Sequence, residues 1–162
     1  MPEYIIVKSQ EEYKVAAILF KEYATWLAID LCFQHFDEEL KNLREAYAKN
    51  NGGIILCKED NNFIGCVAVR KITNDIAELK RMFVQPAHQK KGIGKKMLEE
   101  AITMAENNNY QYIRLDTLAH MNSAIKLYKQ FGFYEIEPYY FNPNPSAIFF
   151  EMKLYQLDIK NG

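Results

Sequence analysis

The sequence lacks most features that mark secreted, membrane or disulfide-rich proteins. Its three cysteines form an odd number without CxxC spacing, which argues against a disulfide framework and a structural zinc site. No apolar run approaches the ~20 residues that span a bilayer. The start, MPEYIIVKSQEEYK, carries charges within a few residues of any apolar stretch, unlike a signal peptide. We therefore expect reduced, buried thiols and a cytoplasmic protein with no membrane segment.

The sequence also has little net charge, few serines and no clustered metal ligands. The formal net charge of −1 argues against nucleic-acid binding, which usually leaves a strongly basic domain. Three serines and the absence of a GxSxG sequence argue against a serine hydrolase. His35, His88 and His120 are scattered without metal-ligand spacing. We expect them on the surface or in loops, and we expect no metal site.

What the chain does contain is typical of one globular domain. With 162 residues, 49% of them apolar and 25% charged, it can bury a core without disulfides or metal. No repeat, low-complexity segment or linker divides it, so we expect a single domain over residues 1–162. Aromatic residues reach 14%, and we expect some of them to line a pocket.

Hydrophobic periodicity and end signals give the order of helices and strands. Ser9 and Glu12 form a capping-box pattern at the start of the first helix, and Gly132 follows the last one. The expected helices are 9–29, 36–47, 92–106 and 121–133, and the expected strands are 4–8, 54–59, 62–72, 74–84, 112–118 and 146–154. This order predicts an α/β domain with a mixed sheet.

The stretch VQPAHQKKGIGKKMLEE, residues 84–100, places two glycines and four lysines at the start of an amphipathic helix. Unpaired amides at a helix N-terminus bind anions, and glycine lets a ligand approach the backbone. A Walker P-loop is excluded because Gln89 stands where its first glycine belongs. A dinucleotide fingerprint fails because Met97 stands at its third glycine. A phosphate site and a merely solvated basic helix start remain the two interpretations.

The segment FVQPAHQKKGIGKKMLEEAI, residues 83–102, resembles the acetyl-CoA-binding motif of the GNAT superfamily of acyl-CoA N-acyltransferases, a strand followed by [QR]xxGx[GA] and a helix. A second block, YIRLDT followed by MNSAIKLYKQFGF, resembles the family's next strand and helix. Its motif positions hold Asn122, Ala124, Leu127, Tyr128, Gly132 and Phe133. The likeness covers about residues 53–154. It implies a central mixed sheet flanked by helices on both faces.

The resemblance also implies acetyl-CoA as acyl donor. Members of the family bind the pantetheine arm with the strand before the loop, which splays from its neighbour and carries a bulge whose N–H can polarise the thioester carbonyl. Asn122 would reach the cofactor from the last helix. The implied pantetheine residues are Met82, Phe83 and Val84, and the implied pyrophosphate residues are Gln89, Lys90, Lys91, Gly92, Ile93, Gly94 and Lys95.

Transfer to an amine needs a base for the amine and an acid for the departing thiolate. The resemblance assigns the acid to Tyr128, and our candidate base is Glu78, acting directly or through water. A core tyrosine and a carboxylate paired with Lys80 or Arg81 are the structural alternatives. Strand alternation would put the adjacent charges of the ELKR segment on opposite faces.

The acceptor is less well defined than the donor. Asp37 and Glu38 would suit a cationic amine, and the alternative is that they are acids at a helix N-terminus that the dipole favours. Arg70, Lys80 and Arg81 would instead suit an acceptor with a carboxylate. The aromatic segment 137–145 is expected to form a wall of its pocket. A primary amine of a small molecule or peptide is the first hypothesis. A protein lysine or N-terminal acetyltransferase and a CoA-binding sensor without turnover are the alternatives. Members of the family are often dimers, so the resemblance also admits a homodimer.

Overall fold

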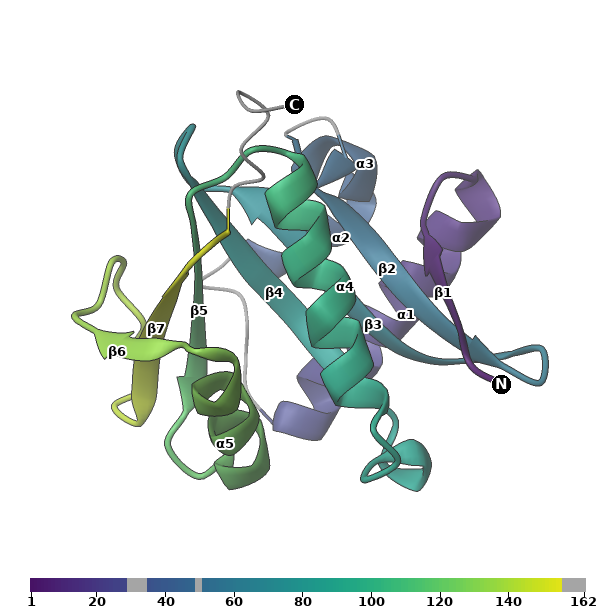
Figure 1. Ribbon diagram of the computed structural model, residues 1–162. Coiled ribbons are helices and arrows are strands. Elements are labelled where there is room, and N and C mark those ends of the chain that lie inside the picture. The colour runs from purple at the N-terminus through teal and green to yellow at the C-terminus, as the bar shows by residue number, and fades with distance from the viewer. Residues whose placement is uncertain (29–34, 49–50, 156–162) are drawn as a thin grey trace.

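The computed structural model describes residues 1–28, 35–48 and 51–155, which form one sheet with helices on both faces (Figure 1). In chain order the elements are β1 (Glu3–Ile6), α1 (Gln10–Leu27), α2 (Phe36–Lys41), α3 (Leu43–Ala46), β2 (Gly53–Glu59), β3 (Asn62–Lys71), β4 (Ile76–Val84), the 3₁₀ turn η3 (Pro86–His88), α4 (Ile93–Asn107), β5 (Tyr112–Leu118), α5 (Asn122–Phe131), β6 (Tyr134–Ile136) and β7 (Ala147–Lys153).

The sheet is mixed, as expected. Its strand order is β1-β2-β3-β4-β5-β7-β6, and among these neighbours only β4 and β5 run parallel. Figure 1 shows α4 and α5 on one face and α1, α2 and α3 on the other. The prediction of a mixed sheet with helices on both faces is therefore confirmed.

Alternating strand residues build a separate core on each face of the sheet. Val67 and Val69 of β3 face α4, whereas Cys66 and Ala68 pack under α1. The residues of the predicted apolar stripe of α4, which are Ile93, Met97, Leu98, Ala101, Met104 and Ala105, are all buried. The 3.6-residue period thus located the packed face of this helix correctly.

The predicted helix ends are confirmed at Ser9 and Gly132, and two elements of the structure differ from the prediction. Ser9 and Glu12 form the capping box of α1, and Gly132 ends α5 in the left-handed region. The expected helix 36–47 is instead two short helices, because Asn42 leaves helical geometry between them. The three-residue strand β6, paired with β7, went unpredicted because it is too short for a period-2 pattern.

β4 departs from regular strand geometry in two ways that shape the site. Ala68 pairs with Lys80 and Cys66 with Phe83, so β4 carries one extra residue, and Arg81 there has a positive φ of 57°. Beyond Glu78, β4 no longer pairs with β5, although β5 continues to Leu118. The two parallel strands therefore separate on the side where α4 begins (Figure 1). The family resemblance implied this bulge and this splay.

The remaining expectations concern cysteines, histidines and possible spans. Cys57 and Cys66 are buried free thiols, as expected, and Cys32 lies outside the described residues. His35 and His120 are exposed, while His88 is partly buried in η3. Across the described ranges, no cluster of three or more potential metal ligands is found. Nor does any helix in those ranges combine the length and apolar character that a membrane span needs.

Candidate active site

A cavity of about 670 Å³ opens where β4 and β5 separate. Its wall comes from the end of α1, from β4, from the start of α4, from β5 and from α5, with Asn142 of the following loop. We distinguish two ends by their residues. The α4 end comprises Met82 to Lys95 with Asn122, and the α1 end comprises Tyr23, Trp26, Lys80, Arg81, Asp116 and Asn142.

The α4 end presents free backbone donors. The first helical hydrogen bond of α4 runs from Lys96 N–H to Gly92 C=O, so the amides of Ile93, Gly94 and Lys95 have no partner within the helix. Gly92 caps the helix without a side-chain hydrogen bond. Together with the helix dipole, these amides form a positive site suited to a phosphate.

The two glycines at this helix start have different reasons to be glycine. Gly92 has φ of +82°, a left-handed conformation that side chains rarely adopt. Gly94 has no such φ, and a Cβ there would meet no atom within 4 Å. Packing therefore does not require glycine at 94. Its missing side chain keeps the space above the free amides open.

Most sequence-predicted cofactor residues lie in the cavity wall. These are Met82, Phe83, Val84, Gln89, Lys90, Gly92, Gly94, Lys95 and Asn122. Gln89 is held in place because its Nε2 donates to the carbonyl of Val84 at 2.8 Å. Asn122 is the first residue of α5, across the cavity from α4.

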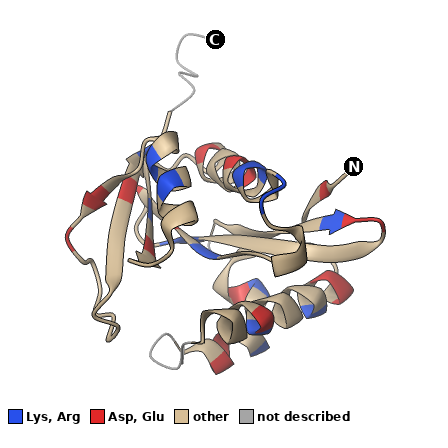
Figure 2. Ribbon diagram, turned by 90° about the horizontal axis from the view of Figure 1, so that it is seen from below, with Lys and Arg blue, Asp and Glu red and all other residues tan. Residues whose placement is uncertain are grey.

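Two predicted residues of the same loop lie outside that wall. Ile93 is buried in the core under α4, and Lys91 is exposed to solvent. In Figure 2 the loop and start of α4 are blue, which marks this end as locally basic although the net charge of the chain is −1. From outside the wall Lys91 adds positive charge, whereas Ile93 offers its backbone amide.

Tyr128 also lies in the cavity wall, although it is almost fully buried. Its ring packs edge-on against Phe133, with centroids 5.6 Å apart. Burial, with smaller contributions from Tyr23 and Asp116, raises the pKa of Tyr128 well above its ordinary value. No hydrogen bond joins its hydroxyl to another of the described residues. The hydroxyl therefore keeps its proton at neutral pH and is not committed to a neighbour.

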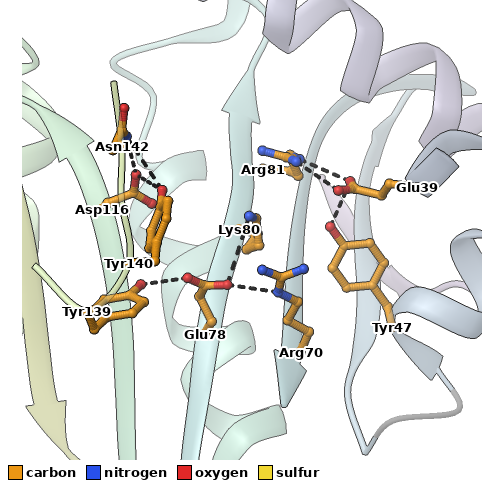
Figure 3. Close-up of polar contacts among 10 residues, drawn as sticks. All are labelled: Glu39, Tyr47, Arg70, Glu78, Lys80, Arg81, Asp116, Tyr139, Tyr140 and Asn142. Atoms are coloured by element: carbon orange, nitrogen blue, oxygen red, sulfur yellow. Dashed lines mark hydrogen bonds and ion pairs between the residues drawn. The ribbon is translucent and has the colours of Figure 1, made fainter. Parts of the chain in front are cut away.

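Glu78, the predicted base, is buried and does not line the cavity. Its carboxylate accepts the Nε–H of Arg70 at 2.8 Å and the hydroxyl of Tyr139 at 2.6 Å, and it lies 3.9 Å from the Lys80 ammonium (Figure 3). The alternative of an ion-paired carboxylate is thus realised with Arg70 and Lys80. Arg81 belongs to a different pair.

Arg81 forms a bidentate ion pair with Glu39, a residue that sequence reasoning missed. Its Nε and Nη2 donate to the two carboxylate oxygens at 3.0 and 2.8 Å, and the hydroxyl of Tyr47 donates to Glu39 at 2.8 Å. Burial alone would raise the pKa of Glu39, but the hydrogen bonds and charge of Arg81, together with the Tyr47 hydrogen bond and the charge of Lys80, outweigh it and hold the pKa below its usual range. The predicted acids Asp37 and Glu38 are instead exposed.

Lys80 and Arg81 do not point to opposite faces, contrary to strand alternation. Lys80 pairs with Glu78, and Arg81 pairs with Glu39 on α2 (Figure 3). Both charged side chains therefore lie on the face of the sheet that α1, α2 and α3 cover. The bulge causes this, because its extra residue shifts the alternation by one. Burial, followed by repulsion from Arg81, lowers the pKa of Lys80 to about 8.

Asp116 is the second functional side chain that sequence reasoning missed. It lies on β5 in the cavity wall and accepts hydrogen bonds from the Tyr140 hydroxyl and from Asn142 Nδ2, the latter at 3.0 Å. Tyr139 and Tyr140 both pack edge-on against Phe149 of β7. The aromatic segment 137–145 thus lies beside the α1 end, where it holds Asp116 in place.

These features fit a ligand with a diphosphate at one end and an extended polar chain behind it. The free amides and open space at Gly94 suit the diphosphate. The unpaired edge of β4 beyond Glu78 offers main-chain groups to an extended arm. Tyr128 lies in the same cavity wall.

Comparison with known proteins agrees with the geometry. Residues 18–133 match the model of the acetyltransferase (GNAT) family. An uncharacterized N-acetyltransferase of Dictyostelium discoideum is 31% identical over 92% of this chain and 98% of its own length. A GNAT-family acetyltransferase structure from Staphylococcus aureus Mu50 superposes with a TM-score of 0.79 at 23% identity, covering 96% of this chain and all of the other. An Elizabethkingia anophelis GNAT acetyltransferase with acetyl-CoA bound is 26% identical, with a TM-score of 0.57 over 70% of this chain and 83% of its own.

Proposed function

The chain belongs to the GNAT family of acetyltransferases, and we propose that it moves an acetyl group from acetyl-CoA to a primary amine of a small molecule or peptide. The observation that carries this proposal is one cavity that joins a free helix start to a splayed, bulged strand. Acetyl-CoA has a diphosphate, an extended pantetheine arm and a thioester, in that order. The cavity offers groups suited to each.

The α4 end would hold the donor. The amides of Ile93, Gly94 and Lys95 would take the diphosphate, with Gln89, Lys90, Lys91 and Gly92 shaping and charging the loop. The backbone of Met82, Phe83 and Val84 would pair with the pantetheine arm, and Asn122 would approach it from α5. When bound, acetyl-CoA supplies an activated acetyl group as its thioester.

Tyr128 is our proposed general acid for the departing thiolate. Its raised pKa keeps the phenol protonated, and its hydroxyl has no partner among the described residues. A backbone N–H at the β4 bulge is the proposed donor to the thioester carbonyl. Glu78 stays a sequence-based prediction for the base, and from its position outside the cavity wall it would need a water relay.

Two measurements test this function in sequence. Titration calorimetry should detect binding of CoA and of acetyl-CoA, and free thiol should then appear when acetyl-CoA is mixed with an amine panel. The panel contains butylamine, phenethylamine, Nα-acetyl-lysine and a lysine-containing peptide. Binding of the cofactor without thiol release from any amine would indicate a sensor, and no binding at all would remove the proposal entirely.

A further inference from the structure

Asp116 differs from Glu39 and Glu78 in its partners, because those two carboxylates form ion pairs and Asp116 accepts hydrogen bonds from neutral groups. Figure 3 draws the carboxylates of Glu39, Glu78 and Asp116 with their polar contacts. Glu39 has Arg81, and Glu78 has Arg70 and Lys80. Among the described residues, Asp116 has two neutral donors, one hydroxyl and one amide. Within the described ranges, no lysine, arginine or histidine forms an ion pair with it.

The nearest candidate cation on the same strand is already occupied. Arg114 lies two residues before Asp116 and therefore on the same face of β5. Its Nε donates to Glu151 at 2.7 Å, and its guanidinium lies 5.3 Å from the centroid of the Tyr139 ring in a cation–π contact. Arg114 is thus directed toward β7, and the Asp116 charge remains available to the cavity.

Asp116 is also the one acidic side chain among the described residues of the cavity wall. A half-buried anion that pairs with no cation of the described residues attracts a cation from solution or from a ligand. Its charge reaches the reactive region, since it contributes to the raised pKa values of Tyr23 and Tyr128. The hydrogen bonds from Tyr140 and Asn142 fix the direction of its carboxylate.

We propose that Asp116 binds the ammonium of the acceptor and takes its first proton, so that the acceptor is an aliphatic primary amine that arrives as a cation. This inference rests on the acetyl transfer proposed above. Tyr140 and Asn142 are positioning residues that hold the carboxylate.

The proton and bond changes balance without a further reactant. One ammonium proton passes to Asp116 and then to solvent, which frees the nitrogen lone pair. The new C–N bond replaces the C–S bond, whose electron pair stays on sulfur. Tyr128 gives its proton to that sulfur, and the remaining surplus proton of the nitrogen restores the phenol. The products are an N-alkyl acetamide, free CoA and one proton in solution.

The decisive variant is Asp116→Asn, which keeps the size of the side chain and removes its charge. We expect kcat/KM for butylamine, phenethylamine and Nα-acetyl-lysine to fall by about 100-fold or more, the scale of a lost general base. The Kd for acetyl-CoA should stay within about 2-fold, because Asp116 lies at the α1 end. Asp116→Glu, which keeps the charge, should recover part of the lost activity.

Two comparisons separate a charge effect from general damage. Aniline and p-anisidine are largely uncharged at neutral pH, so any transfer to them should be much less sensitive to Asp116→Asn. Tyr140→Phe should lower kcat/KM for the alkylamines several-fold. Tyr134→Phe removes a similar tyrosine–carboxylate hydrogen bond, to Glu151, away from the cavity wall and should change nothing.

The outcomes are distinct for the inference and for the enzyme. If wild type transfers acetyl to alkylamines and Asp116→Asn does so equally well, the inference is wrong and the acetyltransferase function stands. The same holds if Asp116→Glu is as inactive as Asp116→Asn. If wild type binds acetyl-CoA and releases thiol with none of the amines, aryl amines included, both proposals fail. Transfer to the aryl amines alone contradicts only the inference.

Discussion

The two ends of the cavity are built from different material. The α4 end binds through backbone, with three amides at a helix start, an open glycine and an unpaired strand edge. The α1 end works through side chains that come from α1, β4, β5 and the loop before β7. Backbone groups are the same in every sequence that folds this way, so the first end can serve one cofactor. Side chains vary, so the second end can set the acceptor.

This difference also predicts how each end responds to mutation. At the α4 end a substitution acts by blocking space or by straining the chain. At the α1 end a substitution removes one member of a charged network, and the partner left behind is buried. The predictions below test this contrast, beginning with the largest expected effect.

Glu39→Gln should destabilise the protein most, although it touches no proposed reacting group. It leaves the buried guanidinium of Arg81 without its counter-charge, and breaking a buried pair in this way costs about 3–5 kcal/mol. Urea unfolding measures the loss. The exposed neighbour Glu38→Gln, on the same short helix, is the matched control and should change stability by less than about 0.5 kcal/mol.

If Glu39→Gln does not fold, the double variant Glu39→Leu with Arg81→Leu decides the matter. Removing both charges should restore most of the stability, because no buried charge then lacks a partner. Equal stability of Glu39→Gln and Glu38→Gln would contradict the view that the α1 end depends on this pair.

Tyr128→Phe tests the proposed general acid in the cavity wall. We expect kcat to fall about 100-fold, with little change in the Kd for acetyl-CoA, because the phenol is needed only when the thiolate departs. The side chain is packed against Phe133 and Phe150, so removal of one oxygen should leave stability nearly unchanged. An unaltered rate across the pH range would make Tyr128 a core residue.

Lys80 gives the charged network a pH dependence. Its pKa falls to about 8 when folded, against ~10.4 in an unfolded chain, so between these values the unfolded chain binds more protons. Stability contributed at this position therefore rises with pH above 8. The charges that surround it belong to Arg81, Glu78, Arg70 and Glu39.

Measuring urea unfolding of wild type and Lys80→Met from pH 8 to 9.5 isolates this effect. Wild type should gain about 1–2 kcal/mol relative to the variant over that interval. The two buried thiols act in the opposite sense, since burial raises their pKa, but they are common to both proteins. Parallel curves for the two proteins would show that Lys80 is not perturbed.

The α4 end was predictable because its parts are consecutive. Residues 82–95 contain the strand, the loop and the helix start, and each carries a local physical signal. The glycines predict an accessible backbone, the apolar period predicts the helix, and the resemblance to the family predicts the bulge and the splay. The roles of Met82 to Lys95, Asn122 and Tyr128 in binding and transfer stay predictions.

The α1 end was not predictable because its contacts are distant in sequence. Glu39 and Arg81 lie 42 positions apart, and Asp116 and Asn142 lie 26 apart. Asp37 and Glu38 were named instead of Glu39 because a short helix gives no clear inward face. For Asp116 one signal existed. Ile113 and Leu115 alternate with Arg114 and Asp116, which indicates a polar face on a strand inside the sheet.

The smallest expected effects come from the two glycines of the α4 end, and they should differ in kind. Gly92→Ala should lower stability by about 1 kcal/mol, because alanine must adopt φ of +82°. Gly94→Ala should keep or raise stability by up to about 1 kcal/mol, since its Cβ meets no atom and alanine favours the helix. The same methyl group occupies the space above the free amides, so we expect acetyl-CoA affinity to fall several-fold in Gly94→Ala. Calorimetry and urea unfolding on both variants check this. If Gly94→Ala bound acetyl-CoA as wild type does, the diphosphate would not lie over residue 94. Cofactor binding would then not explain why residue 94 is glycine.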